Sequence, residues 1–188
     1  MNIGEELVAD YLQYIKKCEF VQKNLYTEDV QGEIDVVGIN LKIKTVYFCE
    51  VTIHLVTGLL YVNAKDNKPN NVNKIYDKFK KDIEYARKNF PEYNHVFMLW
   101  SPIVKKSSEK ALHNQYKDVQ DVICRIKEDF GIEIEAIINE VFLEKLQELR
   151  DYSANESKDI KSAVMRLYQI EAKTQKYINS KNHKSQQE

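Results

Sequence analysis

The spacing of apolar residues predicts several amphipathic helices. In residues 3–16, apolar side chains recur every three or four positions, which places them on one face of a helix. The same spacing occurs in residues 72–89, shortly before Pro91, and in residues 107–129, where Gly131 is a suitable C-terminal cap.

The C-terminal part of the chain has the same helical spacing. Asn139 is a suitable N-cap for a helix that runs to about Arg150, and residues 151–157 form a polar break. A last helix is predicted over residues 158–178, with one apolar stripe and a frayed end.

Five segments have the apolar patterns of β-strands. They are residues 19–26, 33–39, 43–56, 95–100 and 132–138. The second and third are rich in β-branched and aromatic residues, which predicts a hairpin with its turn at residues 38–40. The fourth is continuously apolar, as in a buried central strand, and the fifth alternates apolar and acidic residues, as in a strand near a sheet edge.

The order of these elements predicts an α/β fold. A helix precedes three strands that are expected to pair antiparallel, and the strand–helix alternation that follows favours parallel pairing. The expected architecture is a mixed β-sheet, with antiparallel hairpins followed by parallel strands, flanked by helices and extended by C-terminal helices. Residues 1–150 would form this domain, and residues 151–188 a C-terminal helix and tail packed on it.

Composition limits the class of protein. Of the 188 residues, 43% are hydrophobic and 30% are charged, which is typical of a globular chain with a substantial core. No apolar run approaches the roughly 18 residues of a membrane span, and acidic residues stand where a signal peptide would be apolar. The three cysteines form no CxxC pair, so they indicate neither a zinc ribbon nor a disulfide framework. We therefore expect a cytoplasmic protein without membrane contact.

Charge is distributed unevenly, although the net charge is only −1. Residues 63–90 contain eight basic and four acidic residues, and residues 158–184 contain seven and two. Residues 118–151 instead contain ten acidic and four basic residues. This net charge argues against a strongly basic protein that coats nucleic acid. The chain can still present a basic face to nucleic acid. The solvated faces of amphipathic helices give the same pattern.

Two acidic residues fall inside otherwise apolar predicted strands. Asp35 closes the sequence GEID (residues 32–35), and Glu50 lies within FCEVT (residues 48–52). Paired antiparallel strands can bring both carboxylates to one face at cross-strand distance. Their burial is costly unless a charge neutralises it, which a hard divalent cation does well. A Lys or Arg partner, or a solvent-facing position, would also explain the pair.

Together with the first helix, these motifs resemble the PD-(D/E)XK nuclease superfamily. The chain has GEELVADYL at residues 4–12, GEID at residues 32–35 and FCEV at residues 48–51. The likeness is closest to the YraN-like and Holliday-junction-resolvase-like branch of restriction-endonuclease-like proteins, in which a helix with a GE…A..YL pattern precedes GEID and an EVK strand. It covers residues 3–90 and implies a helix, three antiparallel strands, a helix and a parallel strand.

The resemblance also implies a metal site. Asp35 matches the metal-binding aspartate of the family and Glu50 its second acidic ligand, and the carbonyl of Val51 would face the same ion. Glu5 corresponds to the acid that the first helix contributes, with Glu6 as the alternative if the helix is rotated. Mg²⁺ would be the cofactor, with Mn²⁺ as a substitute.

One position departs from the family pattern. Where the family has a lysine two residues after the glutamate, this chain has Thr52, which brings no positive charge to the phosphate. In one explanation, the role of that lysine has moved to Lys74 or Lys78 in the next helix. In a second explanation, metal ions alone activate the attacking water, with His54 as a helper. In a third explanation the site is impaired, and the domain binds nucleic acid without cutting it.

The resemblance therefore predicts a Mg²⁺-dependent endonuclease that hydrolyses phosphodiester bonds in DNA, with Asp35, Glu50, Thr52 and Glu5 at the catalytic centre. The alternative is a catalytically impaired module of the same fold that binds nucleic acid or a protein partner. A third option is an unrelated α/β protein whose acidic residues lie on the surface.

Several residues outside the acidic motifs are candidates for nucleic-acid contacts. The basic candidates are Lys74, Lys78, Lys105, Lys106 and Lys110. Tyr76 and Tyr85, in the basic helix, could contact phosphates or bases. The apolar stripe of the last predicted helix would suit a homodimer.

Overall fold

The strands of the chain form a mixed β-sheet. The computed structural model describes residues 2–27, 30–108 and 113–184, and for residues 27, 30–32 and 182–184 it describes the backbone alone. In these residues one five-stranded sheet has the order β1-β2-β3-β4-β5. The strands are β1 (Phe20–Thr27), β2 (Val30–Asn40), β3 (Thr45–Val51), β4 (Asn94–Ser101) and β5 (Ile134–Ile138). β1 to β3 pair antiparallel and β3 to β5 pair parallel, which confirms the predicted α/β class.

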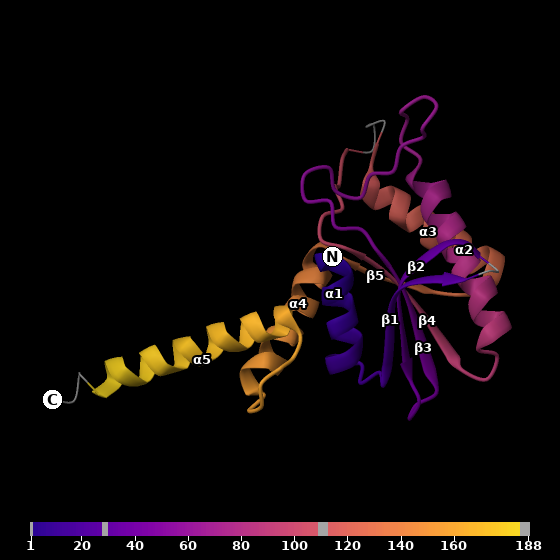
Figure 1. Cartoon of the computed structure of the whole chain (residues 1–188). Coiled ribbons are helices and arrows are strands. Elements are labelled where there is room, and N and C mark those ends of the chain that lie inside the picture. Colours follow the sequence, from indigo (N-terminus) through magenta and orange to yellow (C-terminus); the bar gives the residue numbers. More distant parts are fainter. Residues whose placement is uncertain (1, 28–29, 109–112, 185–188) are drawn as a thin grey trace.

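Helices cover both faces of this sheet (Figure 1). They are α1 (Ile3–Asp10), the π-helical turn η1 (Tyr11–Ile15), α2 (Asn71–Asn89), α3 (Gln115–Phe130), α4 (Asn139–Asn155) and α5 (Ala163–Lys184). α2 and α3 share one core with Phe48 of β3, whereas α1, η1 and α4 share the other with Cys49 of β3 and Trp100 of β4. Within the described residues, no helix is both long and apolar enough to cross a membrane.

The hairpin between β2 and β3 differs in detail from the prediction. Its turn lies at residues 41–44, not at residues 38–40. Gly38 lies inside β2, where a Cβ atom would come within 2.8 Å of Leu12 Cδ1, so the glycine permits η1 to approach the sheet. β3 ends at Val51, and residues 52–56, which were predicted as strand, form a loop.

The later helices also have different bounds. α3 begins at Gln115 rather than at residue 107, and residues 109–112 of the predicted helix lie outside the described residues. Asn139 does not cap α4, because its side chain bonds the N–H and C=O groups of Val104 at 2.8 and 3.0 Å. α4 continues to Asn155, so the expected boundary after residue 150 falls inside a helix.

α5 leaves the body of the molecule as a projecting arm (Figure 1). Met165 and Gln169 in its first turns are buried, whereas residues 173–181 are exposed. The segment between α4 and α5, residues 156–162, is not helical, although the sequence predicted the last helix to begin at residue 158. The arm is therefore attached to the domain through its first turns.

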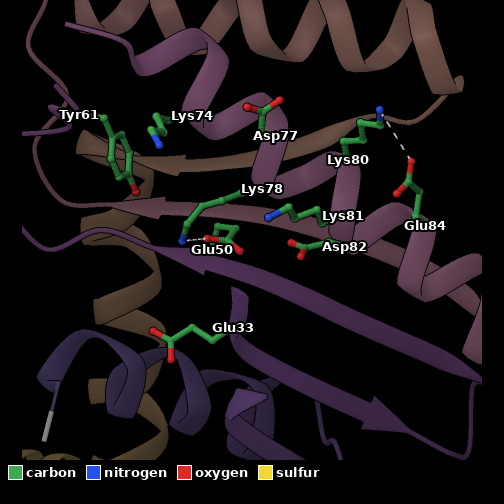
Figure 2. Close-up of a pocket in the computed structure, with 10 residues that line it drawn as sticks. All are labelled: Glu33, Glu50, Tyr61, Lys74, Asp77, Lys78, Lys80, Lys81, Asp82 and Glu84. Atoms are coloured by element: carbon green, nitrogen blue, oxygen red, sulfur yellow. Dashed lines mark hydrogen bonds and ion pairs between the residues drawn. The ribbon is translucent and has the colours of Figure 1, made fainter. Parts of the chain in front are cut away.

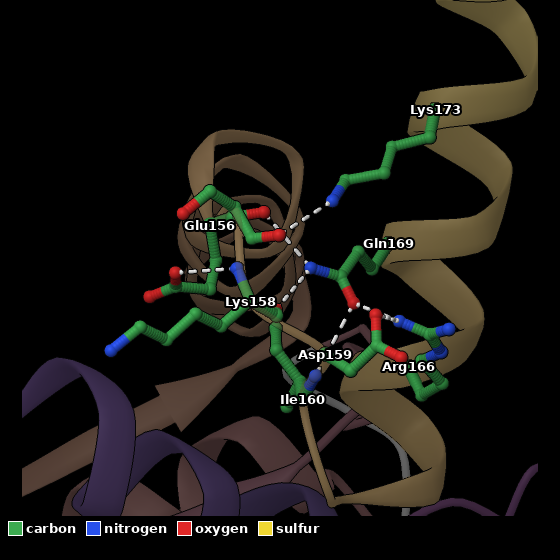
Figure 3. A network of polar contacts seen from close by, with 8 residues as sticks. Glu156, Lys158, Asp159, Ile160, Arg166, Gln169 and Lys173 are labelled. Carbon is green, nitrogen blue, oxygen red and sulfur yellow. Dashed lines mark hydrogen bonds and ion pairs between the residues drawn. The ribbon is translucent and has the colours of Figure 1, made fainter.

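Gln169 fixes this attachment (Figure 3). Its amide nitrogen donates to the carbonyl oxygens of Glu156 and Lys158, at 2.9 and 2.8 Å. Its Oε1 accepts hydrogen bonds from the backbone N–H of Ile160 at 3.3 Å and from Arg166 at 2.7 Å. One buried side chain therefore satisfies three backbone groups of the connecting segment.

We expect Gln169→Leu to lower the free energy of unfolding by about 2–4 kcal/mol, because buried backbone groups lose their hydrogen-bond partners. Urea unfolding monitored by circular dichroism measures this loss. Gln175→Leu, at an exposed position of the same helix, is the matched control and should change the stability by less than about 0.5 kcal/mol. Equal effects of the two substitutions would contradict the assigned role of Gln169.

Candidate functional site

Two buried carboxylates from adjacent strands meet one ammonium group beneath α2. Glu50 of β3 is 2% exposed and Asp35 of β2 is 6% exposed. The Nζ of Lys78, in α2, donates to Glu50 Oε2 and lies 3.4 Å from Asp35 Oδ2. The two carboxylates therefore lie on the same face of the sheet, as the hairpin predicted. The option that these acids lie on the surface is wrong.

The backbone explains why both acids face α2. Glu50 comes two residues after Phe48, which packs in the core under α2 and α3, so strand alternation directs it to the same side. Asp35 lies opposite Asn24 of β1, whose φ of 50° interrupts the regular pairing. Asp35 Oδ2 accepts a hydrogen bond of 2.7 Å from the backbone N–H of Val51. The carboxylate thus takes the place of a strand carbonyl at the end of β3.

A third buried carboxyl group, that of Asp82 in α2, lies beside Glu50 (Figure 2). Burial raises the pKa of Glu50 well above its usual value, and the charge of Asp82 raises it further against the opposing charge of Lys78. Burial also raises the pKa of Asp82 to about 7. When both groups are ionised, Glu50 Oε1 and Asp82 Oδ2 have no hydrogen-bond donor among the described residues. Ionisation of both is therefore costly unless a cation compensates it.

Lys78 supplies the positive charge of the site. Burial by itself lowers the pKa of Lys78, but the charges of Glu50 and Asp35 outweigh burial and raise the pKa above its ordinary value. The ammonium group is therefore charged at neutral pH. Of the two lysines predicted to replace the family's lysine, Lys78 is the one that contacts the carboxylates, and Lys74 lines the same cavity. The lysine partner considered for the acidic pair is thus present.

The cluster opens into a cavity of about 580 Å³ under α2. Four lysines, five carboxylic acids and Tyr61 line it, among them Glu50, Lys78 and Asp82 (Figure 2). Its volume lies within the range of ordinary ligand pockets. The lining therefore mixes both charge signs: its lysines could contact an anionic group such as a phosphate, and its acids could contact a cation.

Thr52 is connected to this cavity through Tyr61. The Oγ1 of Thr52 lies 2.8 Å from the phenolic oxygen of Tyr61, which lines the cavity. Burial raises the pKa of Tyr61, so its hydroxyl keeps its proton at neutral pH. The backbone N–H of Thr52 donates to the carbonyl of Trp100 at 2.9 Å and fixes its position. Thr52 can therefore orient a hydroxyl group but supplies no charge.

The acids of the first helix are placed differently from each other. Glu5 is buried in α1, which packs against β3, and accepts a hydrogen bond from Asn2. Glu6 forms an ion pair with Lys23 of β1. No contact of Glu5 with Asp35, Glu50 or Asp82 is found in the described part of the chain. Its predicted role in the metal shell, and that of the Val51 carbonyl, remain predictions.

The other predicted basic contacts lie in the loop that follows β4. Lys105 Nζ donates to the carbonyl oxygen of Val56 at 2.8 Å. Lys106 Nζ lies 5.4 Å from the centre of the Tyr116 ring. Lys110 lies outside the described residues. Lys105 therefore contacts the loop that leaves β3, whereas Lys106 lies over an aromatic ring of α3.

The two candidate tyrosines and the candidate helper His54 are placed differently from the prediction. Tyr76 is buried and donates to Asp129 at 2.6 Å, and the Tyr85 ring packs against Phe48 with 6.4 Å between ring centres. Both tyrosines belong to the core under α2 and α3 rather than to an open stacking surface. His54 lies in an exposed loop, because β3 ends three residues earlier, and not on a strand face.

Two residues of the site were not identified from the sequence. Asp82 lies on the apolar stripe of α2, three residues after Phe79 and four after Lys78. The helical spacing could therefore have identified it as an acid on a buried helix face. Tyr61 lies in a loop without periodicity. It is placed by its backbone N–H, which donates to Asn71 Oδ1 at 2.7 Å, and no sequence pattern indicates this contact.

The carboxylates of the site are ligands of the type that a hard divalent cation prefers. Within the described residues, no group of three or more His, Cys, Asp or Glu side chains is arranged to hold a metal ion. Asp35 and Glu50 supply two carboxylates, and no side chain or backbone group of the described residues donates a hydrogen bond to Glu50 Oε1. Mg²⁺ is commonly held by one or two carboxylates together with substrate phosphates and water. The pair therefore fits Mg²⁺ in the presence of a phosphate-containing substrate.

Comparisons with protein-family models, with curated proteins and with solved structures find no match to this chain. The resemblance to the PD-(D/E)XK superfamily therefore stays a prediction from the motifs.

We expect Asp82→Asn to make the protein relatively more stable as the pH rises. The pKa of about 7 in the folded protein exceeds the ordinary value of 3.8, so the wild type loses stability between these two pH values. Asparagine carries no such penalty. The free energy of unfolding of Asp82→Asn, relative to that of the wild type, should therefore increase by roughly 2–4 kcal/mol between pH 4 and pH 8. Urea unfolding across this range tests it. Asp77→Asn, at an exposed position of the same helix, should follow the wild-type profile, and a parallel profile for Asp82→Asn would contradict the expectation.

Proposed function

We propose that this chain is a divalent-cation-dependent endonuclease that hydrolyses phosphodiester bonds in DNA. The observation that carries the proposal is the convergence of Asp35 and Glu50, from adjacent strands, on the Lys78 ammonium beside a cavity lined by lysines and carboxylic acids. Asp35 and Glu50 would hold Mg²⁺, and Mn²⁺ would substitute for it. DNA is the proposed substrate because the motifs around these residues resemble those of DNA nucleases.

Each residue of the site has a chemical task in this proposal. Bound Mg²⁺ would supply an activated water and an electrophile for the phosphate. Lys78 places a fixed positive charge beside both carboxylates, where it can stabilise the negative charge that develops on the attacked phosphate. Tyr61 and Thr52 present linked hydroxyl groups at the cavity wall, and they can orient the phosphate or the water. Lys74 adds positive charge to the same cavity.

We place the proposed enzyme in the cytoplasm. Cys18, Cys49 and Cys124 are all free thiols, which suits a reducing compartment. Cytoplasmic DNA would then be the available substrate.

A cleavage assay tests the proposal. Wild-type protein and Asp35→Asn are incubated with supercoiled, branched and single-stranded DNA in Mg²⁺ or Mn²⁺. The proposal predicts cleavage by the wild type and none by Asp35→Asn. Cleavage that survives Asp35→Asn would indicate a contaminating nuclease and remove the support for this site.

A non-cutting module is the second candidate. It is favoured by Thr52 at the lysine position and by the Lys78 ammonium, which neutralises both carboxylates without a metal ion. Binding of DNA without cleavage, by both the wild type and Thr52→Lys, would favour this candidate.

A further inference from the structure

The projecting part of α5 displays apolar side chains to solvent. Ile170 and Tyr177 are 51% and 62% exposed, and Leu167 and Ile178 beside them are exposed as well. Ile170 and Tyr177 are seven residues apart, so they lie on one side of the helix, two turns from each other. Most of the stability of a helix in a protein comes from packing of its apolar face. The arm therefore has a face that contact with another molecule would stabilise.

Basic residues alternate with these two apolar residues along the same side of α5. Arg166 and Lys173 each stand four residues before one of them, and therefore one turn away on the same face. We name the resulting line the arm stripe: Arg166, Ile170, Lys173 and Tyr177. Residues 163–181 of α5 contain four basic residues and one acidic residue, Glu171, which lies off the stripe. The arm stripe is therefore both apolar and basic.

The two cations of the arm stripe have different contacts (Figure 3). Arg166 forms an ion pair with Asp159. Lys173 donates to the carbonyl oxygen of Ser157 at 3.3 Å and pairs with no acid of the described residues. Arg166, Ile170 and Lys173 line a cavity of about 250 Å³ at the base of the arm. A carboxylate that enters this cavity meets the Lys173 ammonium beside an aliphatic side chain.

The outer side of α4 has the opposite charge. Glu140, Glu144 and Asp151 are exposed, and Leu143 beside them is 65% exposed. We name these four residues the α4 stripe. Neither Glu140 nor Glu144 pairs with a cation in the part of the chain that the structure describes. The arm of the same chain thus leaves an acidic stripe with an exposed leucine uncovered.

The two stripes match in spacing and length. Glu144 and Asp151 are seven residues apart. Arg166 and Lys173 have the same separation, so two aligned helices can form both charge pairs at once. The 17 residues of α4 extend about 25 Å, and residues 167–181 of α5 extend about 22 Å. Each stripe can therefore cover the other along most of its length.

These features favour a second copy of this chain over other occupants of the arm. Two arms laid against each other would repel, because both are basic. The phosphates of a nucleic acid would bind the cations but would leave the aliphatic side chains in water. An acidic helix with an exposed leucine satisfies both kinds of group, and the chain itself supplies such a helix in α4. In a two-fold dimer the same contact forms twice.

We propose that the arm of one copy docks along α4 of a second copy, and that the second arm returns the contact in a two-fold dimer. The cations of the arm stripe face the acids of the α4 stripe. Ile170 and Tyr177 are buried against Leu143 of the other copy. The interface uses neither Asp35 nor Glu50, so it is independent of the proposed nuclease function.

Sedimentation velocity of the full chain over a range of concentrations measures the oligomeric state. We expect a reversible dimer of the wild type. Ile170→Ser/Tyr177→Ser should weaken dimerisation by about 10–100-fold, because apolar burial is lost. Leu55→Ser/Val56→Ser, at two exposed positions after β3, is the matched control and should leave the dimer unchanged. Circular dichroism verifies that each variant is folded.

Charge reversal identifies the surface on which the arm docks. Lys173→Glu and Glu144→Lys should each weaken the dimer by about 10-fold or more, because like charges then face each other. An equal mixture of these two variants should dimerise more tightly than either alone, since each arm then meets an α4 of opposite charge. Lys176→Glu, on another side of α5, and Glu128→Lys, at an exposed position of α3, make the same changes of charge and should have little effect.

Several results would overturn this interface. A wild type that is monomeric at every concentration would do so, as would a dimer that Glu144→Lys leaves unchanged or a mixture no tighter than its components. If the wild type is monomeric and Ile170→Ser/Tyr177→Ser lowers the affinity for duplex DNA or for anionic lipid vesicles, the arm is a contact for that partner instead. DNA cleavage by the wild type is measured separately, and its absence would leave the dimer interface standing.

Discussion

Lys78→Ala is expected to lower the rate of DNA cleavage by about 10²–10³-fold at saturating Mg²⁺, which is the usual cost of losing one preorganised group that stabilises transition-state charge. Lys78 is the group of α2 whose ammonium contacts both Asp35 and Glu50. Because the same ammonium competes with a metal ion for these carboxylates, the variant should bind Mn²⁺ at least as tightly as the wild type. Single-turnover cleavage and a Mn²⁺ titration measure the two effects separately.

Two further variants serve as comparisons for Lys78→Ala. Lys74→Ala removes a lysine from the wall of the same cavity and should cost less than about 10-fold, because long-range charge alone is screened. Thr52→Lys should not raise the rate, since Lys78 already provides the charge. A wild-type rate for Lys78→Ala, or a faster reaction with Thr52→Lys, would show instead that the lysine position of the motif is simply vacant.

Glu50→Gln is expected to lower the rate of cleavage by roughly 10³-fold or more, because a proposed ligand of the divalent cation is lost. The same substitution should leave the free energy of unfolding at pH 8 at or above the wild-type value. Burial raises the pKa of Glu50, so its ionisation opposes folding as the pH rises above the ordinary value for a glutamate, and glutamine is free of this cost. Activity and stability should therefore change in opposite directions.

Glu84→Gln provides the control for this pair of effects. Glu84 lines the same cavity but is exposed and forms a side-chain pair with Lys80 at 3.9 Å. We expect small changes in both rate and stability for Glu84→Gln. A large loss of stability in Glu50→Gln would mean that the carboxylate serves mainly as the structural partner of Lys78.

The order and pairing of the elements could be predicted because they follow from local patterns. Strands rich in β-branched residues, the continuously apolar β4 and the helical spacing of α2 each reflect a face that must be buried. The turn between β2 and β3 could not be placed correctly, since Gly38 marks the close approach of η1 and not a chain reversal. Asn139 resembled a helix cap, but its side chain bonds a segment 35 residues away.

The residues of the candidate site were likewise predictable only in part. Asp35 and Glu50 were identified because acids inside apolar strands are unusual in any sequence, and the hairpin register determines that they meet. Whether Lys74 or Lys78 contacts the two carboxylates depends on how α2 crosses β3. No local sequence pattern specifies this crossing. Asp82 could have been predicted, because the helical spacing places this acid on a buried helix face. Tyr61 reaches the site through a loop whose course depends on contacts with Asn71.

Asp35 and Glu50 are proposed to hold a divalent cation at the catalytic site. A crystal soaked in Mn²⁺ tests this proposal most directly, through the anomalous scattering of the metal. We expect an anomalous peak within about 2.0–2.6 Å of an oxygen of each carboxylate, with the Lys78 ammonium moved away from their midpoint. An absent peak at saturating Mn²⁺, with Lys78 still bonded to both carboxylates, would contradict the claim.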